Sequence, residues 1–71
     1  MIDYSTFTDE ALEARLAELR VDHADLDAAI QALSNTTVPD LIVIGRLKRK
    51  KLLLKDEIAR IEDFLNPDII A

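Results

Sequence analysis

The chain has no cysteine and only one histidine, and these shortages limit its chemistry. Without cysteine there are no disulfides, no thiolate zinc sites and no cysteine nucleophiles, which is usual for proteins of the reducing cytosol. One histidine cannot supply the usual ligand set of a zinc site within one chain. A unit of 71 residues buries only about 60% of its unfolded surface. Self-association is therefore the stabilising device left to it.

Glycine, proline and aromatic residues are also scarce. Abundant alanine, leucine and isoleucine, beside 32% charged residues, favour helices over disorder or β-structure. The longest apolar run, "LIVI" at 41–44, is far too short to span a bilayer, and the first residues lack the apolar stretch of a signal peptide. We expect a soluble cytoplasmic protein without membrane association.

Residues 12–33 carry apolar side chains at alternating steps of four and three residues, which is the spacing of a heptad seam. Thr8 stands where a helix N-cap is expected, and Asn35 stands where a left-handed residue often ends a helix. These features predict a helix over about residues 8–34. Its seam consists of Leu12, Leu16, Leu19, His23, Leu26, Ile30 and Leu33.

A second seam of the same spacing predicts a helix over about residues 40–66. Either Asp40 or Thr37 can cap its N-terminus. A short strand at residues 41–44 is the weaker alternative, because the chain has no second strand to pair with it. The second seam consists of Ile44, Leu47, Lys51, Leu54, Ile58, Ile61 and Leu65.

The connection at residues 35–39 is short enough to force the two helices into antiparallel contact. When Leu33 is placed opposite Ile44, every later seam position meets a seam position of the other helix. We therefore predict an all-α fold, a single unit over residues 1–71. The unit is an antiparallel two-helix (αα) hairpin with coiled-coil-like heptad seams.

All three aromatic residues fall at the open end of this hairpin, where we expect an apolar plug. The alternative for the final residues, "PDIIA", is an exposed docking or protease-recognition peptide. The expected plug consists of Tyr4, Phe7 and Phe64 with Ile2, Ile69 and Ile70.

Each seam has one polar member, and the two lie in adjacent layers. His23 and Lys51 interrupt the seams near mid-height, and Asp27 follows His23 by one turn. Because a polar group held in a seam is costly unless it is paired, we predict a central polar cluster of these three residues. Its structural role would be to set the register, as single polar seam residues do in coiled coils. The functional alternative is a metal or pH-responsive site across a dimer axis.

The two predicted helices carry opposite net charges, −5 over residues 8–34 and +2 over residues 40–66. The second helix holds a basic edge, and like charges one turn apart destabilise an isolated helix. We expect aspartates of the first helix at the same height to neutralise it. The basic edge consists of Arg46, Lys48, Arg49, Lys50 and Lys55, and the aspartates are Asp22, Asp25 and Asp27.

The match of charges across the predicted hairpin is incomplete. Arg20 would face Lys55, and Glu13 would face Glu62, so both contacts are like-signed. These conflicts favour a second chain or another partner that completes the pattern.

The second helix also has more apolar surface than one seam needs. Contiguous exposed apolar residues of this kind mark association sites. We predict a homo-oligomer, with a dimer as the first expectation, in which two hairpins form a four-helix bundle, or else binding to another helical protein. The predicted interaction face consists of Leu52, Leu53, Leu41, Ile42 and Val43.

The segments "DHADLDAAI" (22–30) and "RLKRKKLLLKDEI" (46–58), with the terminal "PDIIA", resemble the YdcH family of small bacterial helical-hairpin proteins. The resemblance covers nearly the whole chain and departs from the family at Asp22, where glutamate is common. It implies a helical hairpin and supplies no substrate, cofactor or reaction. The matching residues are His23, Leu26, Asp27, Ile30, Leu47, Lys48, Lys51, Leu52, Leu54, Lys55 and Asp56.

Three classes of function can be compared. An enzyme is disfavoured because a thin hairpin offers no cleft of the several hundred Å³ typical of ligand sites, and the chain has no phosphate loop, nucleophile elbow or HExxH motif. We expect no catalytic residue, metal or cofactor. Weak backbone-directed nucleic-acid binding by the basic edge is the alternative, against which stand a pI of ≈ 4.6 and the lack of aromatics in the basic run. The pattern favours a protein–protein interaction or self-assembling scaffold module.

Overall fold

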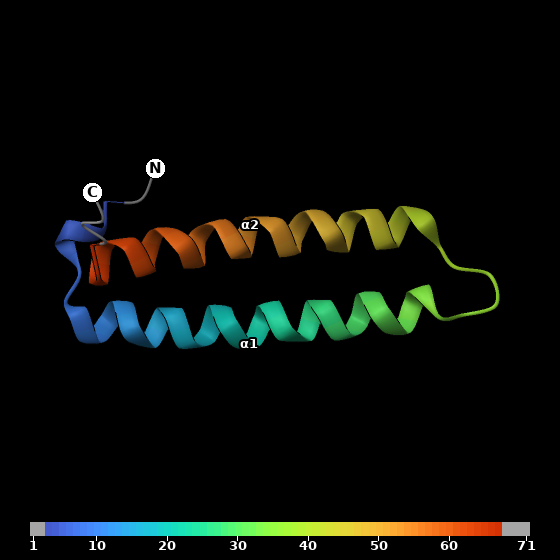
Figure 1. The fold of residues 1–71 in the computed structure, drawn as a ribbon, viewed down its shortest axis with the longest axis horizontal. Coiled ribbons are helices and arrows are strands. Elements are labelled where there is room, and N and C mark those ends of the chain that lie inside the picture. Colours follow the sequence, from blue (N-terminus) through green and yellow to red (C-terminus); the bar gives the residue numbers. More distant parts are fainter. Residues whose placement is uncertain (1–2, 68–71) are drawn as a thin grey trace.

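Two long helices make up almost all of the structure, a computed structural model that describes residues 3–67. Helices α1 (Asp9–Ser34) and α2 (Leu41–Leu65) lie side by side and antiparallel, joined by a loop at one end (Figure 1). A short 3₁₀ helix, η1 (Tyr4–Thr6), lies at the open end, beside the last turn of α2. The predicted all-α helical hairpin is confirmed.

Side-chain caps fix where both helices begin. The Thr8 hydroxyl oxygen accepts a hydrogen bond from the Ala11 backbone N–H at 3.1 Å, as the sequence predicts. Asp40, rather than Thr37, caps α2, since its carboxylate accepts hydrogen bonds from the backbone N–H groups two and three residues later at 3.1 and 3.2 Å. The segment 41–44 is therefore the first turn of a helix, and not a strand.

The predicted left-handed conformation at Asn35 is wrong. Its φ is −91° and its ψ is 4°. The end of α1 is closed instead by the Asn35 N–H, which donates to the Gln31 carbonyl oxygen at 3.1 Å. The Thr36 hydroxyl donates to the Leu33 carbonyl oxygen at 2.8 Å. Because these donors satisfy terminal carbonyl groups, the helix ends without a left-handed residue.

Every buried side chain among residues 3–67 lies on one of the two predicted seams. Ile30 and Ile44 are buried near the loop, whereas a larger buried cluster lies near the open end. Between them, Leu26 and Lys51 are only partly buried. The core is therefore thickest at the open end and thinnest at mid-height. The open-end cluster consists of Leu12, Leu16, Leu19 and Ile61, with Tyr4, Leu54, Ile58 and Leu65 packed against it.

The aromatic residues close the open end in part. The rings of Tyr4 and Phe64 are tilted by 53° with centroids 6.1 Å apart, which is a favourable aromatic arrangement. Tyr4 packs on the core, but Phe7 and Phe64 stay 48% and 42% exposed. The tail at residues 68–71 lies outside the described residues. So do three predicted members of the plug, namely Ile2, Ile69 and Ile70.

Candidate functional site

A polar cluster interrupts the core at mid-height, and an ion pair between the helices forms its centre. The Lys51 ammonium nitrogen (Nζ) lies 2.7 Å from Asp27 Oδ1, and the two side chains are 30% and 42% exposed. Gln31 Nε2 donates to the other Asp27 oxygen at 3.2 Å. The predicted contact between Asp27 and Lys51 is confirmed. Because it joins one particular turn of each helix, it favours the observed register over a slipped one.

His23, the third predicted member of the cluster, makes no side-chain hydrogen bond through its buried nitrogen. Its Nε2 has no partner among residues 3–67. The pKa of the Asp27 carboxyl is lowered from its usual value of 3.8, first by the hydrogen bond from Lys51 and second by the positive charge of Lys51. Partial burial acts in the opposite direction, and His23 adds a smaller lowering. The ion pair, rather than the histidine, therefore dominates the electrostatics of this cluster.

The sequence predicts that aspartates of α1 neutralise the basic edge of α2. In the described structure they do not. Lys51 is the single base between residues 46 and 55 with a carboxylate within 4.0 Å in the described structure. All five members of the basic edge are exposed. Outside this segment every arginine is paired. The pairs are Arg15 with Glu57 at 3.1 Å, Arg20 with Glu62 at 2.7 Å and Arg60 with Asp56 at 2.8 Å.

The predicted like-signed contact of Arg20 is wrong. Arg20 reaches Glu62 at 2.7 Å instead of facing Lys55. Both side chains are long enough to meet along the edge of the hairpin, so Glu62 is paired with Arg20.

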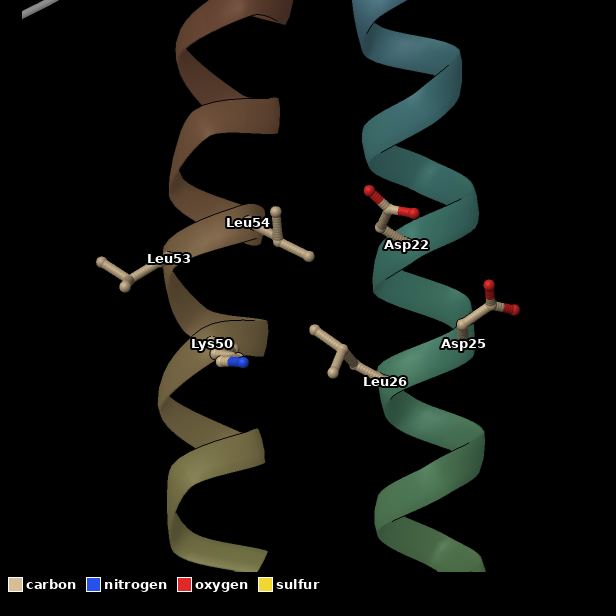
Figure 2. A pocket seen from close by; sticks show the side chains of 6 residues that line it. All are labelled: Asp22, Asp25, Leu26, Lys50, Leu53 and Leu54. Atoms are coloured by element: carbon tan, nitrogen blue, oxygen red, sulfur yellow. The ribbon is translucent and has the colours of Figure 1, made fainter. Parts of the chain in front are cut away.

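A shallow groove opens between the helices at mid-height, on one side of the hairpin. Its volume is about 450 Å³ and its lining is mostly apolar. Leu26 of α1 and Leu54 of α2 point toward one another across it (Figure 2). The groove also has carboxylates on its α1 bank and an ammonium group on its α2 bank. The complete lining is Asp22, Asp25, Leu26, Lys50, Leu53 and Leu54.

This groove differs from the sequence-based prediction, in which a two-helix hairpin offers no cleft of several hundred Å³. Leu26 and Leu54 are seam residues that stand beside the polar seam positions His23 and Lys51. A seam that contains polar residues in two adjacent layers leaves the neighbouring apolar residues only partly covered. The polar residues in the two seams were therefore the sequence feature from which the groove could have been predicted. We call the side of the hairpin on which the groove opens the groove side.

The predicted interaction face is exposed but does not form one continuous side. Successive residues of a helix are about 100° apart. Leu53 lines the groove and Val43 precedes the groove residue Lys50 by seven residues, so both lie on the groove side. Leu41 and Leu52 lie on the opposite side of α2. The exposed fractions are 64% for Leu52, 65% for Leu53, 76% for Leu41, 69% for Ile42 and 36% for Val43.

Neither a metal site nor a membrane-spanning helix is found within residues 3–67. Within this range no group of three or more histidine, cysteine, aspartate or glutamate side chains is placed to hold a metal ion. Neither α1 nor α2 combines the length and the apolar character that a bilayer-spanning helix needs.

No curated protein and no solved structure matches the chain significantly. A family model described as "Protein of unknown function (DUF465)" matches residues 16–62. This range begins in the open-end core, contains the central ion pair and the whole basic edge, and ends in α2 after Ile61. It covers more than half of the chain, and the family includes the YdcH-like small helical proteins that the sequence resembles. The chain therefore belongs to the DUF465 family.

Proposed function

We propose that this protein is a non-enzymatic interaction module that binds a helix of another polypeptide along α2. The observation that carries the proposal is the coincidence of exposed leucines and unpaired bases on one helix. Leu52 and Leu53 are 64% and 65% exposed although they lie between the seam residues Lys51 and Leu54. Large apolar side chains gathered on a surface are typical of association sites.

The charges of α2 support the same proposal. Exposed cations that lie close together repel one another, and this repulsion destabilises the helix when no carboxylate is nearby. The bases of the basic edge are placed in this way. An acidic helix laid against the groove side of α2 would bury Leu53 and neutralise the cations beside it in one contact. Apolar anchors surrounded by complementary charge are a common way to bind a helix.

The proposal can be tested by photo-cross-linking in cells that make the protein. A photo-reactive amino acid is placed at Leu52 or at Leu53, with a control at Ala14, which is exposed on α1. We expect cross-links from α2 and none from the control. The same complex should disappear from native separations of the Leu52→Glu/Leu53→Glu variant, whose helicity should stay near that of the parent because both side chains are exposed. The absence of any cross-link from positions 52 and 53, to any chain, would refute the interaction function.

A second candidate function is weak binding to a nucleic-acid backbone. The observation in its favour is that the five members of the basic edge form no ion pair within the described structure. Phosphate contacts by such bases would produce a steep loss of affinity with salt. The matched variants are Arg46→Gln/Arg49→Gln, which removes unpaired cations, and Arg20→Gln/Arg60→Gln, which removes paired ones. Equal retention of DNA or RNA by both variants, or none by the parent at low salt, would dispose of this function.

A further inference from the structure

We infer that the groove side of the hairpin binds a second copy of this chain about a two-fold axis parallel to the helices. In the resulting four-helix bundle, α1 of each copy lies against α2 of the other, and both loops lie at the same end. This inference rests on the proposed interaction function and names its partner and geometry. Three observations lead to it: the apolar residues of the groove side, its charges and its size.

Exposed apolar residues occur along the whole length of the groove side. Positions seven residues apart on a helix lie on the same side, so Val43 and Phe64 share the side of the groove residue Lys50. Phe7 lines a second hollow at the open end together with Glu57, which also follows Lys50 by seven residues. The loop end, the middle and the open end of this side each hold an exposed apolar residue. The exposed fractions are 36% for Val43, 65% for Leu53, 42% for Phe64 and 48% for Phe7.

The charges of the groove side are complementary to themselves. The α1 bank carries Asp22 and Asp25, and the α2 bank carries Lys50, with Arg46 one turn away. None of these four side chains has an oppositely charged group within 4.0 Å in the described part of the chain. At mid-height the groove side thus has an acidic bank on α1 and a basic bank on α2. Toward the open end Arg15 and Glu57 reverse these signs, and the two helices again carry opposite charges. A surface whose two banks carry opposite charges can bind a rotated copy of itself.

The charges also select one of two symmetric arrangements. When two hairpins stack on their groove sides, a two-fold axis perpendicular to the helices would place α1 on α1 and acid on acid. An axis parallel to the helices places α1 on α2 and acid on base. Rotation about the parallel axis does not shift any residue along the helices, so each residue keeps its height along the hairpin. Because Asp25 and Lys50 line the same groove in one chain, Asp25 comes level with Lys50 of the second copy.

The groove side is large enough for such an interface. The molecule measures 46 × 28 × 19 Å, and the two helices lie side by side in the plane of its two longer dimensions (Figure 1). A stable protein interface takes about 800 Å² from each partner. A flat side of this length and width can supply that area.

The first test compares two adjacent leucines of almost equal exposure. Leu53 lines the groove, and Leu52 does not. We expect Leu53→Glu to raise the dimer dissociation constant at least about tenfold, as loss of an interface anchor does, while Leu52→Glu leaves it near the parent value. Sedimentation equilibrium over a wide concentration range measures both. A larger effect at Leu52 would place the interface on the opposite side and overturn the inference.

The second test exchanges the signs of the two banks. Asp22→Lys/Asp25→Lys and Arg46→Glu/Lys50→Glu should each weaken self-association, and an equimolar mixture of the two variants should restore it as a heterodimer. The net charges of the variants, −1 and −9 from a parent value of −5, are both negative, so overall attraction cannot explain recovery on mixing. If Asp22→Lys/Asp25→Lys associates as tightly as the parent, the acids of one copy do not lie on the bases of the other, and the proposed arrangement is wrong.

The third test measures where the loops lie, using the absence of native cysteine. Val38 in the loop is 86% exposed, and a spin label on the Val38→Cys variant reports the distance between loops in the dimer. Labels at the same end should lie well within the 46 Å length of the molecule, whereas a perpendicular axis would separate them by about that length. Failure of this inference can be distinguished from failure of the proposed interaction function. If the chain stays monomeric at every concentration, the inference is overturned, but cross-links from positions 52 and 53 to a different protein would still support the interaction function. If these positions form no cross-link to any chain, both the inference and the interaction function are overturned.

Discussion

The two halves of this hairpin differ in how completely they satisfy their own side chains. In the open-end half, a buried cluster of leucines and an isoleucine joins the helices, and Arg15, Arg20 and Arg60 all have carboxylate partners. In the loop-end half the core is thinner, and none of its four bases, Arg46, Lys48, Arg49 and Lys50, has a carboxylate within 4.0 Å in the described part of the chain. The open-end half therefore pairs its arginines and buries most of its seam within a single chain, whereas the loop-end half leaves its bases unpaired. The contrast indicates that the open-end half contributes more to the stability of the fold.

The largest expected effect comes from breaking the open-end core. Leu19 has no exposed surface and belongs to the main buried cluster. Leu19→Ala should lower the free energy of unfolding by about 2–5 kcal/mol, since it removes buried methyl groups and leaves a cavity. Urea unfolding monitored by circular dichroism measures this change at a concentration where the protein is monomeric. The control is Leu52→Ala, which truncates an exposed side chain of α2. We expect it to change the free energy of unfolding by no more than about 0.5 kcal/mol.

The loop-end half should become more stable when its single glycine is replaced. Gly45 lies within α2, and a Cβ atom added there would meet nothing within 4 Å. Gly45→Ala should therefore stabilise the hairpin by about 1 kcal/mol through helix propensity. Thermal unfolding of parent and variant shows the gain. A loss of stability that grows with protein concentration would instead reveal a second chain packed closely against this glycine.

The polar cluster at the boundary between the halves should make stability depend on pH. The pKa of Asp27 in the folded protein lies below its usual 3.8 because Lys51 donates a hydrogen bond to it and attracts its negative charge. The ionised pair thus stabilises the fold above that value, and this contribution is lost as the pH falls through the lowered pKa. Urea midpoints measured between about pH 5 and pH 2 should fall less for Lys51→Met than for the parent. Lys48→Met, which removes an unpaired exposed lysine, should behave like the parent.

The smallest expected effect concerns the ion pairs that join the helices near the open end. Arg20 and Glu62 are about half exposed and lie 2.7 Å apart. A double-mutant cycle with Arg20→Gln and Glu62→Gln should give a coupling energy of about 0.2–1 kcal/mol, decreasing as salt is added. The same cycle with Arg20→Gln and Lys55→Gln is the control and should give a coupling energy near zero. A repulsive coupling there would restore the side-chain arrangement first expected from the sequence, in which two like charges face each other.

Much of the fold followed from the spacing of apolar residues. Two seams of equal length, a cap at Thr8 and a short connection were enough to predict an antiparallel hairpin. The central pair of Asp27 and Lys51 was also predictable, because a polar residue in a seam needs a partner close by. The candidate surface was predictable only in part. Leu52 and Leu53 are adjacent in sequence, but the helix turns them toward different sides.

The helices, their caps and the seams along which they meet follow from the order of residues along one chain, so they could be predicted from it. Which charges pair, which leucines share a side and where the groove opens became clear only from the packed hairpin. Those features depend on which side chains of the two antiparallel helices come within reach of one another, and neither helix contains that information alone. Arg20 illustrates the difference, since residue counting placed it opposite Lys55, whereas in the folded hairpin it pairs with Glu62 at 2.7 Å.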